Sequence, residues 1–271
     1  SLVGAVDVDD DENPDTARAA DALWAQQYER LLRRTRELAG DEYIIITNGS
    51  SNPDFFPYVN GRMFETFPSS HQTLAHWSQM TGEYRAVERG ATPQRVVMIN
   101  VNTDNTGGVG SREDYRAVRF GLATTLLGDG YFSYDEGTNN HATLWTYDEF
   151  SAYLGAPMSD LQNVFNPQKT TIDPGVWRRE FEEGQVIVNA TDSTQTMDLD
   201  GEFEKLHGTQ DPAVNNGRIV SEITLAAQDG VILLRPIEEI VGATFVNVAI
   251  ARVYNLDGTT KRTGFFAYDS S

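Results

Sequence analysis

The chain has 271 residues, of which 39% are hydrophobic and 10% aromatic. This is enough for one large domain or two ordinary ones, and it excludes a disordered or collagen-like chain. Asp and Glu number 40 against 21 Lys and Arg, so the formal net charge is −19. Such a chain repels phosphate backbones and anionic lipids, and its apolar runs are too short to cross a bilayer, so we expect neither nucleic acid binding nor membrane insertion. Cysteine is absent, which removes disulfides, thiolate catalysis and zinc–sulfur sites.

The first part of the chain, residues 1–155, alternates short apolar runs with stretches of helical periodicity. The runs predict strands at residues 3–8, 43–47, 58–64, 96–101 and 131–134. The helical stretches span residues 15–39, 70–89 and 111–127. Ser111 caps the last helix, with Glu113 and Asp114 in its first turn, where the helix dipole favours acids. A strand–helix–strand repeat of this kind predicts a parallel α/β sheet.

The pattern changes after Ala156. A polar loop with several prolines leads into β segments that are divided by turn signals such as Asp229-Gly230 and Asp257-Gly258. The segments lie at residues 175–181, 185–189, 202–207, 219–225, 231–235, 244–253 and 263–268. We predict an antiparallel β-sandwich over residues 156–236 and a β-rich C-terminal extension over residues 237–271.

Every predicted strand of the first part ends in acids or amides. Ligands of parallel α/β folds bind at the carboxyl ends of the strands, so these side chains should share one rim. Acids and amides hydrogen-bond sugar hydroxyls, and a carboxylate pair supplies the acid and the nucleophile or base of glycoside hydrolysis. Any one position is more often a turn or helix-cap residue, but the recurrence after five strands favours a carbohydrate site. The rim residues are Asp7, Asp9, Asp10, Asn48, Glu65, Asn102, Asp135, Glu136 and His141.

Other chemistries lack their motifs. The sequence has no Gly-x-Gly-x-x-Gly, phosphate-loop or Gly-x-Ser-x-Gly pattern. Asp7, Asp9 and Asp11 place oxygens at alternate positions, as a calcium loop does, yet the mid-loop glycine is missing and Arg18 stands where the bidentate Glu would be. Strand-end acids followed by a helix cap explain this segment better than Ca²⁺ binding, so no metal or cofactor is expected.

Several stretches resemble TIM-barrel glycoside hydrolases, the families of bacteria and archaea described as hypothetical glycosyl hydrolases. The resemblance covers about residues 1–236 and leaves the rest of the chain outside it. It is carried by residues 60–68, 114–116, 130–135 and 145–150 in the first part, and by residues 175–192 and 229–234 in the second.

The resemblance implies both a fold and a function. The five predicted strands would be strands four to eight, so the chain would hold the C-terminal five βα units of a (β/α)8 barrel followed by the β-sandwich. In related barrels the catalytic acids commonly follow the fourth and sixth strands, which assigns the carboxylate pair to Asp7, with Asp9 and Asp10 as neighbours, and to Glu65. The first strand reads Gly4-Ala5-Val6-Asp7 rather than the usual Gly-Val-Phe-Leu-Asp, so the choice among its aspartates stays open. The implied activity is hydrolysis of a polysaccharide or oligosaccharide.

The predicted barrel is incomplete. A whole barrel needs about 250 residues, and an unpaired apolar first strand would leave a sheet edge open to association. We therefore expect the missing N-terminal barrel half, from the same precursor or from another chain, to close the barrel near its first and fifth strands. A self-sufficient open sheet is the alternative.

A second function competes with hydrolysis. The chain could be a non-catalytic carbohydrate-binding or cell-surface assembly protein that retains the barrel scaffold, because a fold does not fix a function. Residues 241–268 would then serve assembly through strand pairing. The acidic composition, the absence of cysteine and a polysaccharide-type site favour an extracellular or cell-surface location for either function.

Overall fold

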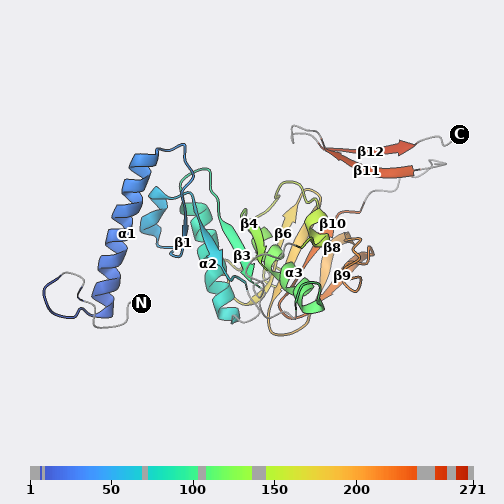
Figure 1. The fold of residues 1–271 in the computed structure, drawn as a ribbon. Coiled ribbons are helices and arrows are strands. Elements are labelled where there is room, and N and C mark those ends of the chain that lie inside the picture. The colour runs from blue at the N-terminus through green and yellow to red at the C-terminus, as the bar shows by residue number, and fades with distance from the viewer. Residues whose placement is uncertain are drawn as a thin grey trace. The chain divides into compact units, whose positions relative to one another are not determined.

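The computed structural model describes residues 7, 10–68, 73–102, 108–135, 145–236, 248–254 and 261–267. They fall into two units, Ser1–Pro236 and Ile237–Ser271. The helices described in the first unit are α1 (Ala17–Ala39), α2 (Leu74–Gly90) and α3 (Arg112–Leu126), with the short 3-10 helices η1 (Pro53–Tyr58) and η3 (Asp148–Ser151) (Figure 1). Thr16, Thr73 and Ser111 cap the three α-helices, since each side chain accepts a hydrogen bond from a first-turn amide.

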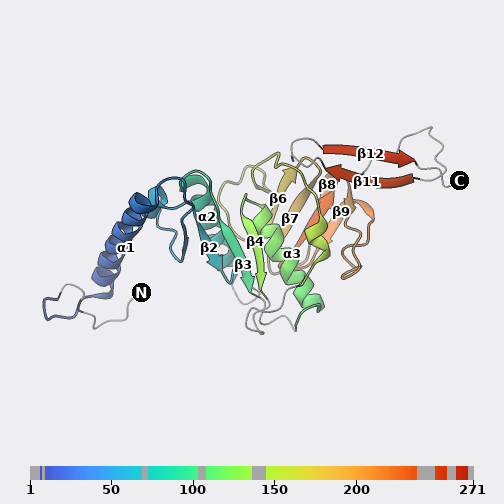
Figure 2. The same cartoon turned by 45° about the horizontal axis from the view of Figure 1, so that its top comes forward.

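Four strands of the first unit form a parallel sheet. Their order is β1-β2-β3-β4 (Figure 2), with bounds Ile46–Asn48, Gly61–Glu65, Met98–Asn102 and Tyr131–Asp135. The predicted parallel α/β arrangement is confirmed for these strands. The predicted strand at residues 3–8 lies outside the described residues except for Asp7, so the count of five βα units stays a prediction.

Helices α2 and α3 both cover one face of the parallel sheet. The register puts Phe64, Ile99 and Phe132 in one cross-strand row on that face. Phe64 meets Tyr84 of α2 edge-on, with ring centroids 6.1 Å apart. Gly121 of α3 lies so close to Val101 and Phe132 that a Cβ would overlap the Val101 side chain. These contacts make the helix-covered face a dry core in which Phe64, Ile99 and Val101 are fully buried.

Strands β1 and β2 begin later than predicted because side chains occupy the backbone groups ahead of them. Arg36 donates to the carbonyl of Tyr43 at 2.7 Å, and the amide of Ile45 donates to Asn60 Oδ1 at 2.8 Å. These groups are therefore not available to a neighbouring strand. Tyr58, predicted as a strand residue, is the last residue of η1.

The second sheet is antiparallel, in the order β5-β6-β7-β10-β8-β9 (Figure 2). Strand β10 pairs with β7 over its whole length but with β8 only through Leu233 and Leu234, so β8 and β9 can curl away from the rest. The strands are β5 (Gln162–Asn163), β6 (Gly175–Phe181), β7 (Gly184–Ala190), β8 (Gln195–Lys205), β9 (Ile219–Leu225) and β10 (Asp229–Leu234). The predicted antiparallel β character is confirmed, but these strands form one curled sheet where a two-sheet sandwich was expected.

The curled sheet has two apolar faces. Trp177, Val188 and Ile232 belong to the same core cluster as the residues between α2, α3 and the parallel sheet. Ile187 and Val231 belong to a second cluster, which β8 and β9 share. The burial of both faces explains why β7 and β10 read as continuous apolar runs rather than as alternating strands.

Helix α3 joins the two sheets. A Cβ added to Gly230 of β10 would lie 2.5 Å from Ala123 Cβ and 2.6 Å from the carbonyl oxygen of Arg119, so only glycine permits this close approach. At the other end of α3, Arg179 of β6 donates to the carbonyl of Gly128 and to Asp129 Oδ1, the latter at 2.7 Å. Cross-layer contacts at both ends therefore fix the helix between the sheets.

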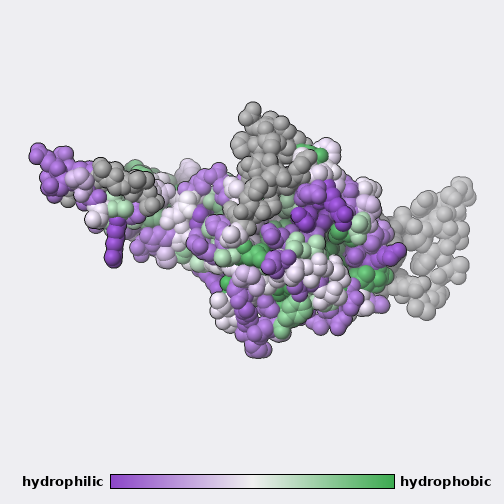
Figure 3. Space-filling view, turned by 90° about the horizontal axis from the view of Figure 1, so that it is seen from below, coloured by the Kyte–Doolittle hydropathy of each residue, from purple (hydrophilic) through white to green (hydrophobic). Residues whose placement is uncertain are grey.

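The second unit contains a two-stranded antiparallel sheet in its described part. Strand β11 (Val248–Tyr254) pairs with β12 (Lys261–Ala267) in a register that runs from Val248 opposite Ala267 to Tyr254 opposite Lys261. None of the described helices combines the length and the apolar character needed to cross a membrane. The face seen in Figure 3 is mostly hydrophilic, with small apolar patches.

Candidate active site

The carboxyl ends of β1 to β4 bring four predicted rim residues to one edge of the parallel sheet. Asn48, Glu65, Asn102 and Asp135 are the last residues of the four strands. In the register, Asn102 lies opposite Asp135, and Glu65 lies opposite Asn100. The chain order of polar strand ends therefore becomes a spatial row, as expected for a parallel sheet.

The face of the parallel sheet away from α2 and α3 is polar at this edge. Glu65, Asn100 and Ser133 form one cross-strand row, and Asn100 Nδ2 donates to Ser133 Oγ at 3.3 Å. Two residues earlier on each strand, Met63, Met98 and Tyr131 form a second row on the same face. Tyr131 is 57% exposed and Ile46 of β1 is 38% exposed. Among the described residues, this face has an apolar base and a polar rim, and no element covers it.

Glu65 is the exposed carboxylate of the rim. No described residue forms a hydrogen bond or ion pair with its side chain. The chain turns sharply behind it, because Thr66 has a positive φ of 55° and the amide of Phe67 donates to the Asn100 carbonyl at 3.1 Å. Phe67 is then fully buried, which anchors the turn and holds Glu65 at the sheet edge.

Asp7 organises the loop in front of α1. Its Oδ1 accepts from the amides of Asp10 at 2.8 Å and Asp11 at 3.2 Å, and its Oδ2 accepts from the amide of Glu12 at 2.8 Å. Asp7, Asp10 and Asp11 are exposed. No described contact joins Asp7 to Glu65, so the carboxylate pair stays a prediction.

The remaining predicted site residues are only partly visible. Asp9, Glu136 and His141 lie outside the described residues, as do the side chains of Asn102 and Asp135. Within the described part of the chain, no three His, Asp or Glu side chains are grouped closely enough to hold a metal ion.

Asp114 is a buried residue that the sequence interpretation reduced to a helix-dipole acid. Its Oδ2 accepts from the amide of Gly110 at 2.9 Å and from the hydroxyl of Tyr147 at 2.7 Å, and its Oδ1 accepts from the hydroxyl of Tyr134 on β4. Asp114 therefore ties the loop that enters α3 to β4 and to the segment before η3. The only sequence signal was its place in an acidic first turn, which cannot reveal partners from three other segments.

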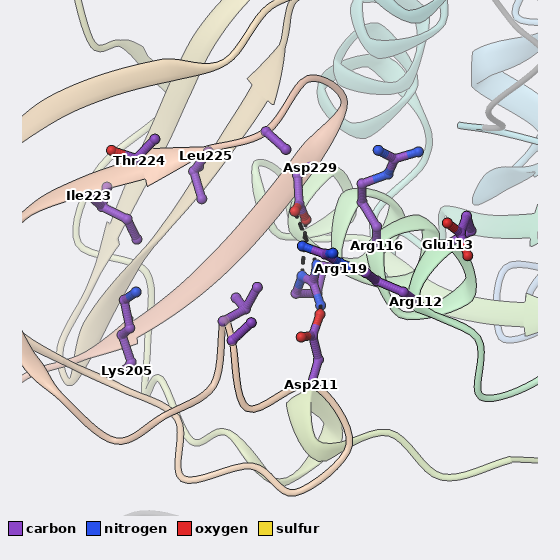
Figure 4. A pocket seen from close by; sticks show the side chains of 13 residues that line it. Arg112, Glu113, Arg116, Arg119, Lys205, Asp211, Ile223, Thr224, Leu225 and Asp229 are labelled. Atoms are coloured by element: carbon purple, nitrogen blue, oxygen red, sulfur yellow. Dashed lines mark hydrogen bonds and ion pairs between the residues drawn. The ribbon is translucent and has the colours of Figure 1, made fainter.

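Arg119 forms a buried ion-pair cluster on the opposite side of α3. Its Nε and Nη2 donate to Asp229 Oδ1 and Oδ2, both at 3.0 Å, and its Nη1 donates to Asp211 Oδ2 at 2.8 Å (Figure 4). Burial lowers the pKa of the guanidinium, but the two carboxylates outweigh this effect and raise it overall. The bidentate geometry locks α3 to β10 and to the loop before β9.

The amino-acid sequence matches one protein family. Residues 4–185 match the model of hypothetical glycosyl hydrolase family 15, which is more than half of the chain. No curated protein matches the chain.

Three solved structures are similar to the chain at a distance. Amy13B of Eubacterium rectale is 12% identical with a TM-score of 0.40, and the match covers 78% of this chain and 56% of that one. AmyP in complex with maltose is 11% identical with a TM-score of 0.37, covering 70% and 55% of the two chains. An AmyP variant in complex with maltotriose is 10% identical with a TM-score of 0.34, covering 66% and 50%. The chain thus spans about half the length of these structures.

Proposed function

Because the chain belongs to hypothetical glycosyl hydrolase family 15, we propose that it forms part of a glycoside hydrolase that cleaves an oligosaccharide or polysaccharide at the carboxyl edge of β1 to β4. The observation that carries this proposal is the row of Glu65, Asn100 and Ser133 on a sheet face that no described element covers. A free carboxylate beside amide and hydroxyl groups can bind sugar hydroxyls and act on a glycosidic oxygen.

Glu65 and Asp7 are the proposed carboxylate pair. Glu65 lies at the rim without a partner among the described residues, so it is free to act as acid, base or nucleophile. Both Asp7 oxygens accept amides of their own loop, which fixes that carboxylate in orientation. Carboxyl groups about 5–5.5 Å apart would indicate retention of configuration, and about 6.5–9.5 Å inversion. The proposed substrate-binding residues are Asp9, Asp10, Asn48, Asn102, Asp135, Glu136 and His141.

We further propose that additional βα units complete the sheet into a barrel. Parallel sheets are almost always covered on both faces, and here the described residues cover only one. Helix α1 supports the same proposal, since Trp24, Leu31 and Leu38 recur every seven residues and are 54%, 59% and 70% exposed. A helix and strands from the rest of a barrel would bury both surfaces. An extracellular or cell-surface location remains part of this proposal.

The test is turnover of a glycan panel by native material and by its Glu65→Gln variant. We expect the variant to lose about 10²-fold or more of the activity, because a positioned acid or base contributes on that scale. The exposed Glu202→Gln on β8 is the matched control and should keep full activity. Turnover by Glu65→Gln at the native rate would contradict the assignment of Glu65.

The same native material tests the completed barrel. Its mass should reveal a companion polypeptide or a longer precursor. A stable, active monomer at the 30.1 kDa of this chain would contradict that part of the proposal.

The second function is non-catalytic carbohydrate binding or surface assembly. The separate β11–β12 unit favours it, since a two-stranded sheet presents edges to which further strands can pair. Glycan binding by both the native protein and Glu65→Gln, with turnover by neither, would support this function over hydrolysis.

A further inference from the structure

A cavity of about 360 Å³ opens beside α3, on the side of the helix that faces the curled sheet (Figure 4). One wall is α3, and the opposite wall is the end of β9 with Lys205 of β8. Its size lies within the range of about 300–1,000 Å³ that is usual for small-molecule sites. The cavity is separate from the Glu65 row, which lies on the far face of the parallel sheet.

Three cations around this cavity lack an anionic partner. Arg112 and Arg116 lie one turn apart on α3, and Lys205 stands on the opposite wall. No described residue forms an ion pair with any of them, although acids outnumber bases by 40 to 21 in the sequence. Elsewhere in the described chain, arginines such as Arg62 and Arg178 do have carboxylate partners. Unpaired cations that converge on one cavity in so acidic a chain indicate a place for an anion.

The environment of Lys205 supports the same conclusion. Burial lowers the pKa of its ammonium group, and the nearby Arg218 lowers it further. A bound anion would reverse both effects, because an opposite charge favours the charged form of a lysine.

The floor and the apolar wall of the cavity limit the kind of anion. Arg119 at the floor is already saturated by Asp211 and Asp229. Ile223 and Leu225 of β9 supply apolar surface next to the cations. The charged lining residues are Arg112, Arg116, Arg119 and Lys205 against Glu113, Asp211 and Asp229, an excess of one positive charge. One excess charge suits a monovalent carboxylate better than a phosphate dianion or a polyanion, which the net charge of −19 would also repel.

We propose that this cavity binds the carboxylate of an acidic sugar, with the sugar ring against Ile223 and Leu225 and the carboxylate between Arg112, Arg116 and Lys205. Arginine pairs with carboxylates through charge-assisted hydrogen bonds, and the C–H face of a pyranose ring suits an apolar wall. The choice of a sugar rests on the proposed function. The site would let the protein hold a glycan that carries a uronate residue, away from the Glu65 row.

Glucuronate and glucose form a matched pair of probes, because they differ only in a carboxylate in place of a hydroxymethyl group. Binding of each, and of inorganic phosphate, is measured by ligand-observed NMR on the native protein at low salt. We expect glucuronate to bind, glucose to bind at least about tenfold more weakly, and added NaCl to weaken only the glucuronate signal. Equal binding of the two sugars would overturn the carboxylate site, and phosphate binding more tightly than glucuronate would overturn its assignment to a sugar.

The double variant Arg112→Gln/Arg116→Gln should weaken glucuronate binding by about tenfold or more, and Lys205→Gln should also weaken it. Arg18→Gln/Arg33→Gln is the control, since it removes the same charge from exposed residues of α1 that line no part of the cavity. An equal loss in the control and the cavity variant would show a general charge effect and contradict the proposal. The readout is binding and not turnover, so it stands whether or not Glu65→Gln proves inactive.

Discussion

Glu149 carries a carboxyl group that the fold removes almost completely from water. The residue is 5% exposed, and its Oε1 accepts a hydrogen bond from Asn215 Nδ2 at 2.8 Å. Burial raises the pKa of Glu149, and the Asn215 hydrogen bond offsets this only in part. The folded state therefore holds this proton more tightly than the unfolded chain, whose glutamates titrate near pH 4.3. Its contribution to stability is fully present below that pH and is lost as the pH rises through the folded pKa.

The variant Glu149→Gln should remove this pH dependence. Glutamine keeps a carbonyl oxygen for Asn215 but has no proton to lose, so its stability relative to native should improve from pH 4 to pH 7. Urea midpoints at several pH values measure the difference, with the exposed Glu202→Gln as the control for an amide substitution. Parallel curves for native protein and Glu149→Gln would show that this carboxyl does not titrate as proposed.

The candidate site was predictable where a residue's role depends on its strand, and not where it depends on distant partners. Glu65 and Asn48 could be placed because the end of an apolar run marks the edge of a parallel sheet. Asp114 could not, because its partners Tyr134 and Tyr147 come from segments that only the tertiary fold brings together. For the same reason, the ion pairs of Arg119 with Asp211 and Asp229 left no signal in the sequence.

The helices were the most predictable elements, because their apolar periodicity and their caps agree. Thr16, Thr73 and Ser111 each stand directly before the helix they cap. The strands were less predictable at their starts. Strand β8 begins at Gln195, well before the predicted residue 202, because Met197 and Leu199 alternate with polar residues that face water. The curl of the second sheet could not be predicted either, since it follows from the short pairing between β8 and β10.

The contact between α3 and β10 predicts opposite effects for two glycine substitutions. Gly230→Ala would place a methyl group 2.5 Å from Ala123 Cβ and 2.6 Å from the backbone of Arg119, so the layers would have to separate. We expect a loss of about 1–3 kcal/mol in the free energy of unfolding, as for other overpacked cores. Gly82 of α2 has no atom near its added Cβ, and Gly82→Ala should gain about 0.5–1 kcal/mol from helix propensity. Urea unfolding measures both, and a neutral Gly230→Ala would contradict the close packing of β10 on α3.

At the scale of the whole molecule, negative charge is in large excess and some of it is placed unfavourably. The net charge is −19, and Asp198 of β8 lies directly opposite Glu222 of β9, both exposed. Like charges directly opposite on neighbouring strands destabilise a sheet. The neighbouring exposed pair is favourable, because the hydroxyls of Thr196 and Thr224 form a hydrogen bond of 2.8 Å. The fold of this hairpin therefore tolerates a repulsion that salt should relieve.

Glu222→Lys should convert that repulsion into attraction and also reduce the net charge. We expect a gain of about 0.2–1 kcal/mol in the free energy of unfolding at 20 mM NaCl, which is the usual range for a cross-strand charge pair. The gain should shrink at about 0.5 M NaCl, where screening acts within a few ångströms, while the native protein itself becomes more stable with added salt. Glu222→Gln separates the two effects, since it removes the repulsion without adding attraction and should lie between native and Glu222→Lys. Sodium chloride is the salt to use, because sulfate also strengthens hydrophobic burial. A gain that is equal in both salt concentrations would mean that strand propensity, and not charge, causes it.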